Sequence, residues 1–304
     1  MLRTLRQHCP GAQVFVLCMD ELCRGLLEQL CLPGVNCISL PEIESVELLA
    51  AKKDRNIAEY CWTLSASLSA WVLDRHPEVD LLTYVDADLM FYSSVEPLFD
   101  EIGASSIAII EHRFTPRLKY LEENGRFCVE WVTFRRNQEG LSCLDRWRKQ
   151  CITWCFARLE DGRMGDQKYL DEWPALYSST CVLQHPGAGL APWNYPNYKI
   201  EAARDGQVLV DGSPLIFYHF HQFQLLDDGG FDRLSSFYTA DMVPPEEVYR
   251  LYEQSLRSVV DEVQLLFPGF MRGMKSTAYI KSRRWAHRFL PRKLKEFLKR
   301  VVKY

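Results

Sequence analysis

The sequence lacks the features of a membrane-spanning, secreted or zinc-stabilised protein. No apolar run among its 304 residues reaches the roughly 18 to 20 residues that a membrane-spanning helix needs. The first ten residues are too polar for a secretory signal peptide. The 11 cysteines form no Cys-x-x-Cys pair, whereas zinc sites favour such pairs with histidine nearby. We therefore expect a cytoplasmic protein with reduced cysteines.

Glycine and proline are also scarce, at 16 and 15 residues, which is an ordinary globular composition. The net charge of −4 is unevenly distributed, because residues 272–304 carry a balance of +11 and the preceding residues carry −15. The basic tail contains interleaved apolar residues, so it predicts an amphipathic helix that binds an anionic membrane surface. A helix packed on the domain fits the same pattern. The acidic remainder argues against nucleic acid as a partner.

Strand-like and helix-like patterns alternate over the first two-thirds of the chain. Strands are expected at 13–18, 36–40, 80–86, 106–111 and 129–134, and helices at 21–30, 54–74 and 137–158. Asp54 is the expected N-cap of its helix. This alternation predicts an α/β domain with a mostly parallel central sheet and flanking helices. We place a catalytic domain at 1–243 and a helical, basic extension at 244–304.

Asp86 and Asp88 follow the most apolar of these strands. On extended backbone, side chains two residues apart point the same way, so the two carboxylates can face one ligand. Paired carboxylates suit Mg²⁺ or Mn²⁺, with phosphate oxygens completing the coordination. A divalent cation would help a diphosphate to leave by neutralising its developing charge. The alternative is a solvated turn acid followed by a helix-capping acid.

The segment from Tyr84 to Phe91 resembles the metal motif of GT-A-fold glycosyltransferases, especially the group of glycogenin and bacterial lipopolysaccharide galactosyltransferases. Three further matches occur in the same order as in that group. They are Gly165-Asp166-Gln167, Pro192-Trp193-Asn194 and Tyr218-His219-Phe220. The stretches 127–131, 165–174 and 187–194 also look like a group of bacterial nucleotide-diphospho-sugar transferases. Together the resemblance spans roughly residues 3–223.

The resemblance implies a GT-A-like fold and a role for each matched residue. It implies that Asp86, Asp88 and His219 hold Mn²⁺ or Mg²⁺. It also implies that Asp166 and Gln167 act at the donor sugar, with Trp193 and Asn194 on the acceptor side. These residues also have simpler interpretations. Asp166 could cap a helix, and Trp193 or His219 could be core residues without a role in binding.

Three further candidates come from their positions in the sequence. His221 shares a face of an alternating strand with His219, so it is a second candidate for donor binding. Arg55, at the start of a helix, either reaches the diphosphate or is an exposed helix charge. Glu130 stands where relatives often have another residue, and is either a catalytic base or nucleophile or a strand-edge acid.

The function expected from the resemblance is a metal-dependent, hexosyltransferase-like enzyme that retains anomeric configuration. A UDP-sugar is the first expected donor, and a saccharide or lipid-linked molecule is the expected acceptor, in cell-surface polysaccharide synthesis at the inner face of the plasma membrane. That group usually has a strand before the helix that matches residues 1–9, and here the chain starts inside that helix. A non-catalytic nucleotide-sugar- or metal-binding relative and a metal-dependent phosphohydrolase therefore stay open as alternatives.

Overall fold

In the computed structural model, which describes residues 1–203, 206–233 and 243–282, the chain divides into two units. They are Met1–His219 and Phe220–Tyr304. The sequence predicts a boundary after residue 243, which falls inside the second unit. Aromatic residues just beyond His219 pack within the second unit, and the predicted catalytic and C-terminal domains stay a prediction.

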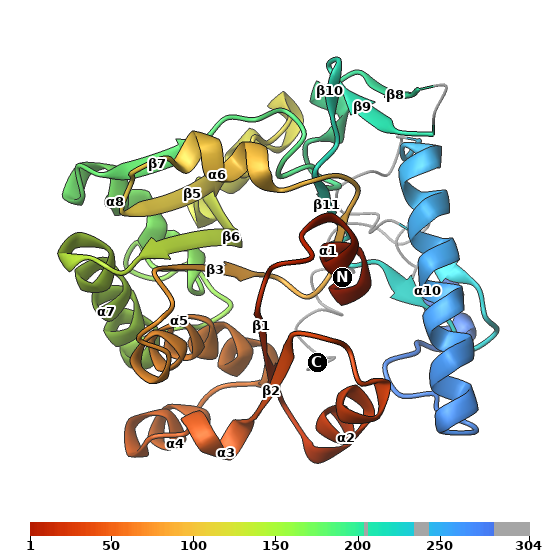
Figure 1. Cartoon of the computed structure of the whole chain (residues 1–304), viewed down its shortest axis with the longest axis horizontal. Helices are drawn as coiled ribbons and strands as arrows, with labels where there is room; N and C mark the ends of the chain where they lie inside the picture. Colours follow the sequence, from red (N-terminus) through yellow and green to blue (C-terminus); the bar gives the residue numbers. More distant parts are fainter. Residues whose placement is uncertain (204–205, 234–242, 283–304) are drawn as a thin grey trace. The chain divides into compact units, whose positions relative to one another are not determined.

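The centre of the first unit is a four-stranded mixed sheet (Figure 1). Its strands, in spatial order, are β3 (Leu81–Val85), β6 (Phe127–Arg135), β5 (Ile107–Glu111) and β7 (Thr180–Leu183). β3, β5 and β7 run in one direction and β6 runs against them. β1 (Val14–Cys18) and β2 (Val35–Ser39) form a separate parallel pair. The predicted α/β class with a central sheet and flanking helices is confirmed, but the reversal of β6 was not predicted.

The first unit contains helices close to the positions predicted at 21–30, 54–74 and 137–158, and further helices that were not predicted. They are α1 (Leu2–His8), α2 (Glu21–Leu30), α3 (Leu40–Ile43), α4 (Val46–Lys52), α5 (Ile57–Arg75), α6 (Glu96–Ile102), α7 (Gln138–Thr153) and α8 (Trp173–Leu176). The 3₁₀ helices are η1 (Pro116–Asn124), η2 (Gln167–Glu172) and η3 (Tyr195–Asn197). α5 packs against α7 (Figure 1).

The N-terminus of α5 differs from the prediction. Its cap is Asn56 rather than Asp54, because the Asn56 side chain accepts a hydrogen bond from the amide of Glu59 at 3.0 Å while the Glu59 carboxylate accepts one from the amide of Asn56 at 2.9 Å. This reciprocal capping box satisfies two amides that would otherwise have no partner in the first turn.

Several short strands complete the first unit. β4 (Leu89–Phe91) pairs antiparallel with β11 (Phe217–His219). A three-stranded antiparallel sheet is formed by β8 (Ile200–Ala202), β9 (Val208–Val210) and β10 (Ser213–Pro214).

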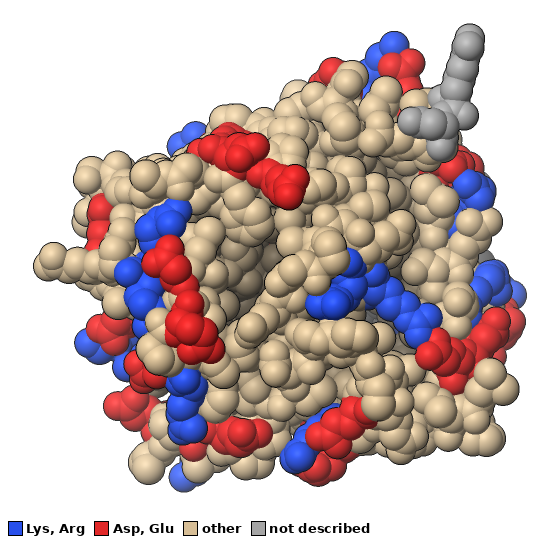
Figure 2. All heavy atoms as spheres, viewed as in Figure 1, with Lys and Arg blue, Asp and Glu red and all other residues tan. Residues whose placement is uncertain are grey.

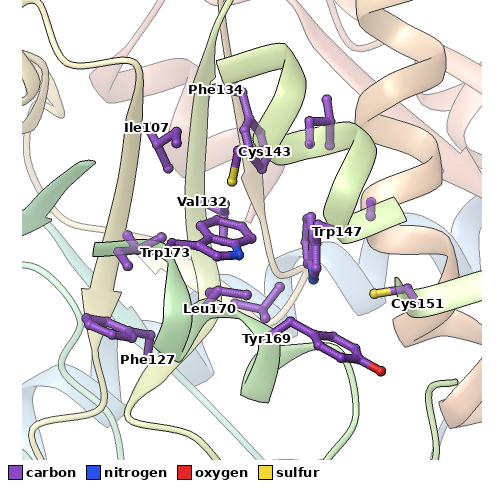
Figure 3. Packing of buried hydrophobic residues seen from close by; sticks show 14 of the residues in the cluster. Ile107, Phe127, Val132, Phe134, Cys143, Trp147, Cys151, Tyr169, Leu170 and Trp173 are labelled. Atoms are coloured by element: carbon purple, nitrogen blue, oxygen red, sulfur yellow. The ribbon is translucent and has the colours of Figure 1, made fainter. Parts of the chain in front are cut away.

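The main hydrophobic core lies between the sheet and the segments α7, η2 and α8 (Figure 3). Trp147 of α7 and Trp173 of α8 are fully buried and meet edge to face, with ring centroids 5.7 Å apart. The indole nitrogen of Trp147 donates a hydrogen bond to the carbonyl of Asp166 at 2.9 Å. The core therefore fixes the backbone that carries Asp166, one of the predicted catalytic residues.

The second unit contains β12 (Gln224–Leu225), β13 (Phe231–Asp232) and the long helix α10 (Glu246–Leu266). Phe220 stacks on Tyr252 of α10 with ring centroids 3.6 Å apart, and Phe223 lies 4.9 Å from the same ring. Arg233 forms ion pairs with Glu246 and Glu253 of the helix. These contacts explain why the residues after His219 group with α10 rather than with the sheet domain.

Within the described residues, no helix combines the length and apolarity needed to cross a membrane. Most of the basic tail, residues 283–304, lies outside the described residues. Its predicted contact with an anionic membrane therefore stays a prediction.

Candidate active site

The two predicted metal-binding carboxylates lie in the turn that joins β3 to β4. Asp86 follows the last residue of β3, and Asp88 precedes the first residue of β4. The sequence predicts an extended backbone here, and that detail is wrong, because Ala87 and Asp88 form a turn. The turn still leaves the carboxylates of both Asp86 and Asp88 near the Nε2 atom of His219.

The pairing of β4 with β11 brings His219 to this turn. In the register of the two strands His219 lies opposite Leu89, the residue after Asp88. The Nε2 atom of His219 lies 3.0 Å from Oδ1 of Asp88 and 3.9 Å from Oδ2 of Asp86. The imidazole is buried, whereas the side chains of Asp86 and Asp88 are 31% and 43% exposed. A ligand from solvent can thus reach the carboxylates in front of a fixed imidazole.

The other ring nitrogen of His219 is held by Glu130. Nδ1 of His219 lies 2.6 Å from Oε2 of Glu130, whose side chain is fully buried. Glu130 belongs to β6, whose register with β5 is irregular and shifts between Ile109 and Ile110. Irregularities of the β-bulge kind redirect side chains and are frequent near active sites.

Cys128 is a further buried residue close to Glu130 and His219. The ligand atoms of Cys128, Glu130 and His219 lie within 4.8 Å of one another, and all three residues are buried. Burial, followed by the charge of Glu130, raises the pKa of the Cys128 thiol. The thiol therefore stays protonated at neutral pH, which makes it a poor metal ligand beside the accessible carboxylates.

The charges of the site are strongly coupled. Burial raises the pKa of Asp86 to about 6; the His219 charge opposes this shift, whereas Asp88 and Glu130 add to it. Burial alone would lower the pKa of His219, but the Asp88 carboxylate and further hydrogen bonds raise it well above its usual value. The carboxylates of Asp86, Asp88 and Glu130 carry more negative charge than the single His219 imidazole can neutralise, so the group attracts a cation.

A hydrogen-bonded chain orients Asp86. The Tyr84 hydroxyl donates to Oδ1 of Asp86 at 3.1 Å, and the Ser65 hydroxyl donates to the Tyr84 oxygen at 3.3 Å. Neither residue was predicted from the sequence. Tyr84 could have been predicted, because it lies two residues before Asp86 in the same strand. Ser65 could not, because it belongs to a helix distant in sequence.

Asp166 and Gln167 lie at the start of η2. Asp166 is buried with 6% exposure. Burial, and then the charge of Asp86, raises the pKa of its carboxyl to about 7. Asp166 precedes η2 without capping it through its side chain, so the capping interpretation does not apply. The side-chain amide of Gln167 donates to the carbonyl of Asn124 at 3.0 Å.

Trp193 and Asn194 lie in a buried loop next to His219. Trp193 is 3% exposed and meets the His219 ring edge to face, with centroids 5.3 Å apart. The Asn194 amide donates to the carbonyls of His112 and Gly189 at 2.9 and 2.7 Å, and its oxygen accepts from the amide of Ala191. In this conformation both side chains support the wall behind the imidazole. Their predicted contact with substrate stays a prediction.

Arg55, predicted to reach the diphosphate, instead makes its hydrogen bonds to the helices α5 and α7. The buried guanidinium of Arg55 donates to the Thr63 hydroxyl at 2.9 Å and to the Ile152 carbonyl at 2.8 Å, so it joins α5 to the end of α7. His221 is half-buried and belongs to the second unit. The predicted role of Arg55 and His221 in substrate binding stays a prediction.

Comparison with known proteins identifies relatives. No family model matches the chain. The protein YfnD of Bacillus subtilis, described as uncharacterized, is 33% identical over 276 residues, which cover 90% of this chain and 88% of YfnD. The uncharacterized YfnF of the same organism is 30% identical over 278 residues, covering 89% of this chain and 90% of YfnF. The chain belongs to the family of YfnD and YfnF.

Solved structures with some likeness to this chain are described as glycosyltransferases. One is involved in glycosylation of the major capsid of PBCV-1, with a TM-score of 0.44 and 10% identity, covering 69% of this chain and 95% of that one. Mouse xyloside xylosyltransferase 1 has a TM-score of 0.42 and 13% identity, covering 68% and 83%. The bifunctional WbbM has a TM-score of 0.40 and 12% identity, covering 72% of this chain and 42% of WbbM. All three TM-scores are below 0.5, which is too low for the likeness to indicate a shared activity.

Proposed function

We propose that the protein is a metal-dependent glycosyltransferase of GT-A-like fold that moves a sugar from a nucleoside-diphosphate donor to a saccharide or lipid-linked acceptor. The observation that supports this proposal is the convergence of Asp86, Asp88 and His219 at the carboxyl end of β3. In α/β sheets, ligands bind beyond the carboxyl ends of strands. The two aspartates are accessible while His219 is fixed behind them.

The donor atoms fit a hard divalent cation such as Mn²⁺ or Mg²⁺. Two carboxylates and one imidazole nitrogen leave positions for diphosphate oxygens. When bound, such an ion would neutralise charge on the departing diphosphate. Manganese is favoured by the imidazole, because Mg²⁺ prefers oxygen ligands.

Glu130 is proposed as a positioning residue. By accepting a hydrogen bond from Nδ1–H of His219, the Glu130 carboxylate would keep Nε2 free of a proton and directed towards Asp86 and Asp88. A carboxylate that fixes the tautomer of a ligating histidine is common in metal sites and supports the metal affinity. Its complete burial supports this role over that of a base or nucleophile in contact with substrate.

Asp166 is proposed to face the donor sugar. Its carboxyl lies close enough to Asp86 for the two charges to interact, so it could bind a sugar hydroxyl or stabilise positive charge on the sugar. Gln167 would assist from the start of η2. Retention of configuration, a UDP-sugar donor and a role in surface polysaccharide synthesis at the membrane are carried as expectations from the family resemblance.

The proposal is tested by thermal shift with UDP, GDP, CMP and dTDP and their common sugars, each with and without Mn²⁺. A ligand that binds only the folded state raises the melting temperature, by an amount corresponding to about 2.7 kcal/mol at 100 times Kd. We expect a metal-dependent shift with one nucleotide class, together with release of the nucleoside diphosphate when a sugar acceptor is present. Release of inorganic phosphate instead would identify a phosphohydrolase.

Variants at the site sharpen this experiment. Asp88→Asn should abolish the metal-dependent shift without loss of folding. Glu130→Gln should weaken Mn²⁺ binding by roughly 10- to 100-fold. Asp74→Asn, which changes an exposed aspartate of α5, is the matched control and should behave as wild type. If Asp88→Asn kept full metal-dependent turnover of the donor, the assignment of the metal site would be wrong.

A further inference from the structure

Helix α5 carries a serine that contacts the segment of Asp166. One turn earlier on the helix, Trp62 packs against Gly165, where φ is +54° and a Cβ atom would lie only 3.4 Å from the indole ring. Ser65 lies three residues after Trp62, so the two side chains are neighbours on one face of the helix. This face brings the Ser65 hydroxyl to Asp166, the residue after Gly165, with which it forms a hydrogen bond.

The same hydroxyl is linked to Asp86. The Ser65 oxygen lies 3.3 Å from the Tyr84 hydroxyl, which donates to Asp86 at 3.1 Å. The single proton of Ser65 goes to Tyr84 when Asp166 is protonated and donates to the serine, and it goes to Asp166 when that carboxyl is ionised. In both states the Ser65 hydroxyl connects Asp166 with the chain that orients Asp86.

Packing alone does not fix this link. Ser65 and Tyr84 both line the large cavity of the first unit, which has a volume of about 780 Å³ and mainly apolar walls. A hollow is visible in the face drawn in Figure 2, over the part of the chain where Figure 1 labels β1 and β3. Because a void offers no contact atoms on its side of these residues, their hydrogen bonds determine where the two hydroxyls lie.

We propose that Ser65 is a positioning residue that holds the Asp166 carboxyl at a fixed place relative to Asp86. This role rests on the proposed function, in which Asp86 holds the metal on the diphosphate of the donor and Asp166 faces its sugar. In a nucleoside-diphosphate sugar the sugar is joined directly to the diphosphate, so the groups that bind the two parts must keep a fixed separation. A displacement of about 1 Å in such a site can cost roughly 100-fold in rate.

Ser67 provides a matched control on the same helix. Ser65 is 4% exposed and Ser67 is 6% exposed, but the Ser67 hydroxyl has no hydrogen-bond partner among the described residues. Replacing either serine by alanine removes one buried oxygen, whereas only Ser65→Ala breaks the link between Asp166 and Tyr84.

The first test measures release of nucleoside diphosphate from UDP-glucose, UDP-galactose, GDP-mannose and dTDP-glucose, with Mn²⁺ and with water as the acceptor. Ser65→Ala should lower kcat about 10- to 100-fold. Its KM for the donor should change less than about threefold, because the diphosphate is still held by the metal. Ser67→Ala should match wild type. Ser65→Thr keeps a hydroxyl that can occupy the same place, so its kcat should stay within about threefold of wild type.

The second test measures binding of Mn²⁺ alone, which separates the two ends of the link. Ser65→Ala leaves the hydrogen bond from Tyr84 to Asp86 in place, so the affinity for Mn²⁺ should change less than about threefold. Tyr84→Phe removes that hydrogen bond and should weaken Mn²⁺ binding roughly 10-fold or more.

The outcomes separate this role of Ser65 from the proposed function. A wild-type protein that releases no nucleoside diphosphate from any of the four donors would overturn the proposed function, and the role of Ser65 with it. If the wild type is active, the role of Ser65 alone is overturned when Ser65→Ala is as fast as Ser67→Ala, or when Ser65→Thr is as slow as Ser65→Ala. A joint loss of kcat and Mn²⁺ affinity in Ser65→Ala would also overturn it, because general damage to the site would then explain the result.

Discussion

The two sides of the first unit have similar strand sequences but very different burial. On the side of β5 and α7, four of the five residues of β5 are fully enclosed, and the core around Trp147 and Trp173 is continuous. On the side of β1, equally apolar strands stay half-buried around a cavity of about 780 Å³. Apolar composition alone therefore does not bury a strand. Burial requires partners along both edges and cover on the faces.

The largest expected effect comes from creating a cavity in the main core, on the closed side of the unit, which contains β5 and α7. Leu144→Ala removes a side chain of α7 that is 2% exposed and belongs to the main core. We expect a loss of about 2–5 kcal/mol in the free energy of unfolding, because transfer and cavity costs both apply. Urea unfolding with an unchanged slope would measure it. A loss below about 1 kcal/mol would show that this side is no better packed than the side of β1.

A smaller effect, of opposite sign, is expected where the closed side buries a charge. Burial raises the pKa of Asp166 from 3.8 to about 7 in the folded protein. The folded state then binds more protons than the unfolded state between these values, so wild-type stability falls as pH rises from about 4 to 7. Asp166→Asn removes this loss. Without metal it should stabilise the protein by roughly 1–3 kcal/mol at pH 8 and by almost nothing near pH 4.

The same substitution should abolish glycosyl transfer if Asp166 faces the donor sugar, so stability and activity would change in opposite directions. Asp74→Asn is again the control, since that aspartate is exposed. Unfolding curves at several pH values in the presence of a chelator provide the measurement. If the gain in the free energy of unfolding did not vary with pH, ionisation of the Asp166 carboxyl would not be its cause.

The contrast between the two sides also shows what could be predicted from the sequence. The strand before Asp86 and the helix at α7 follow from local apolar patterns, and both elements are confirmed by the structure. The grouping of Asp86 and Asp88 with His219 was expected from the family resemblance. The Nε2 atom of His219 lies 3.0 Å from Asp88 and 3.9 Å from Asp86, while their role as metal ligands stays a prediction. The contact of Glu130 with His219, beside a register shift between β5 and β6, depends on strand pairing that no local pattern specifies. The buried contacts of Arg55 with Ile152 depend on helix packing across residues far apart in sequence. Such long-range contacts determine the surroundings of each side chain, so a local sequence pattern could not predict them.

The smallest effect is expected on the open side. Leu81→Ala is the same chemical change as Leu144→Ala, but Leu81 is half-buried and borders the cavity. Because part of its surface already faces empty space, truncation removes few contacts, and we expect a loss below about 1 kcal/mol. Urea midpoints of the Leu81→Ala and Leu144→Ala variants, each compared with wild type, measure the difference. A loss from Leu81→Ala as large as that from Leu144→Ala would mean that β3 is packed as well as the main core and that the contrast between the two sides does not hold.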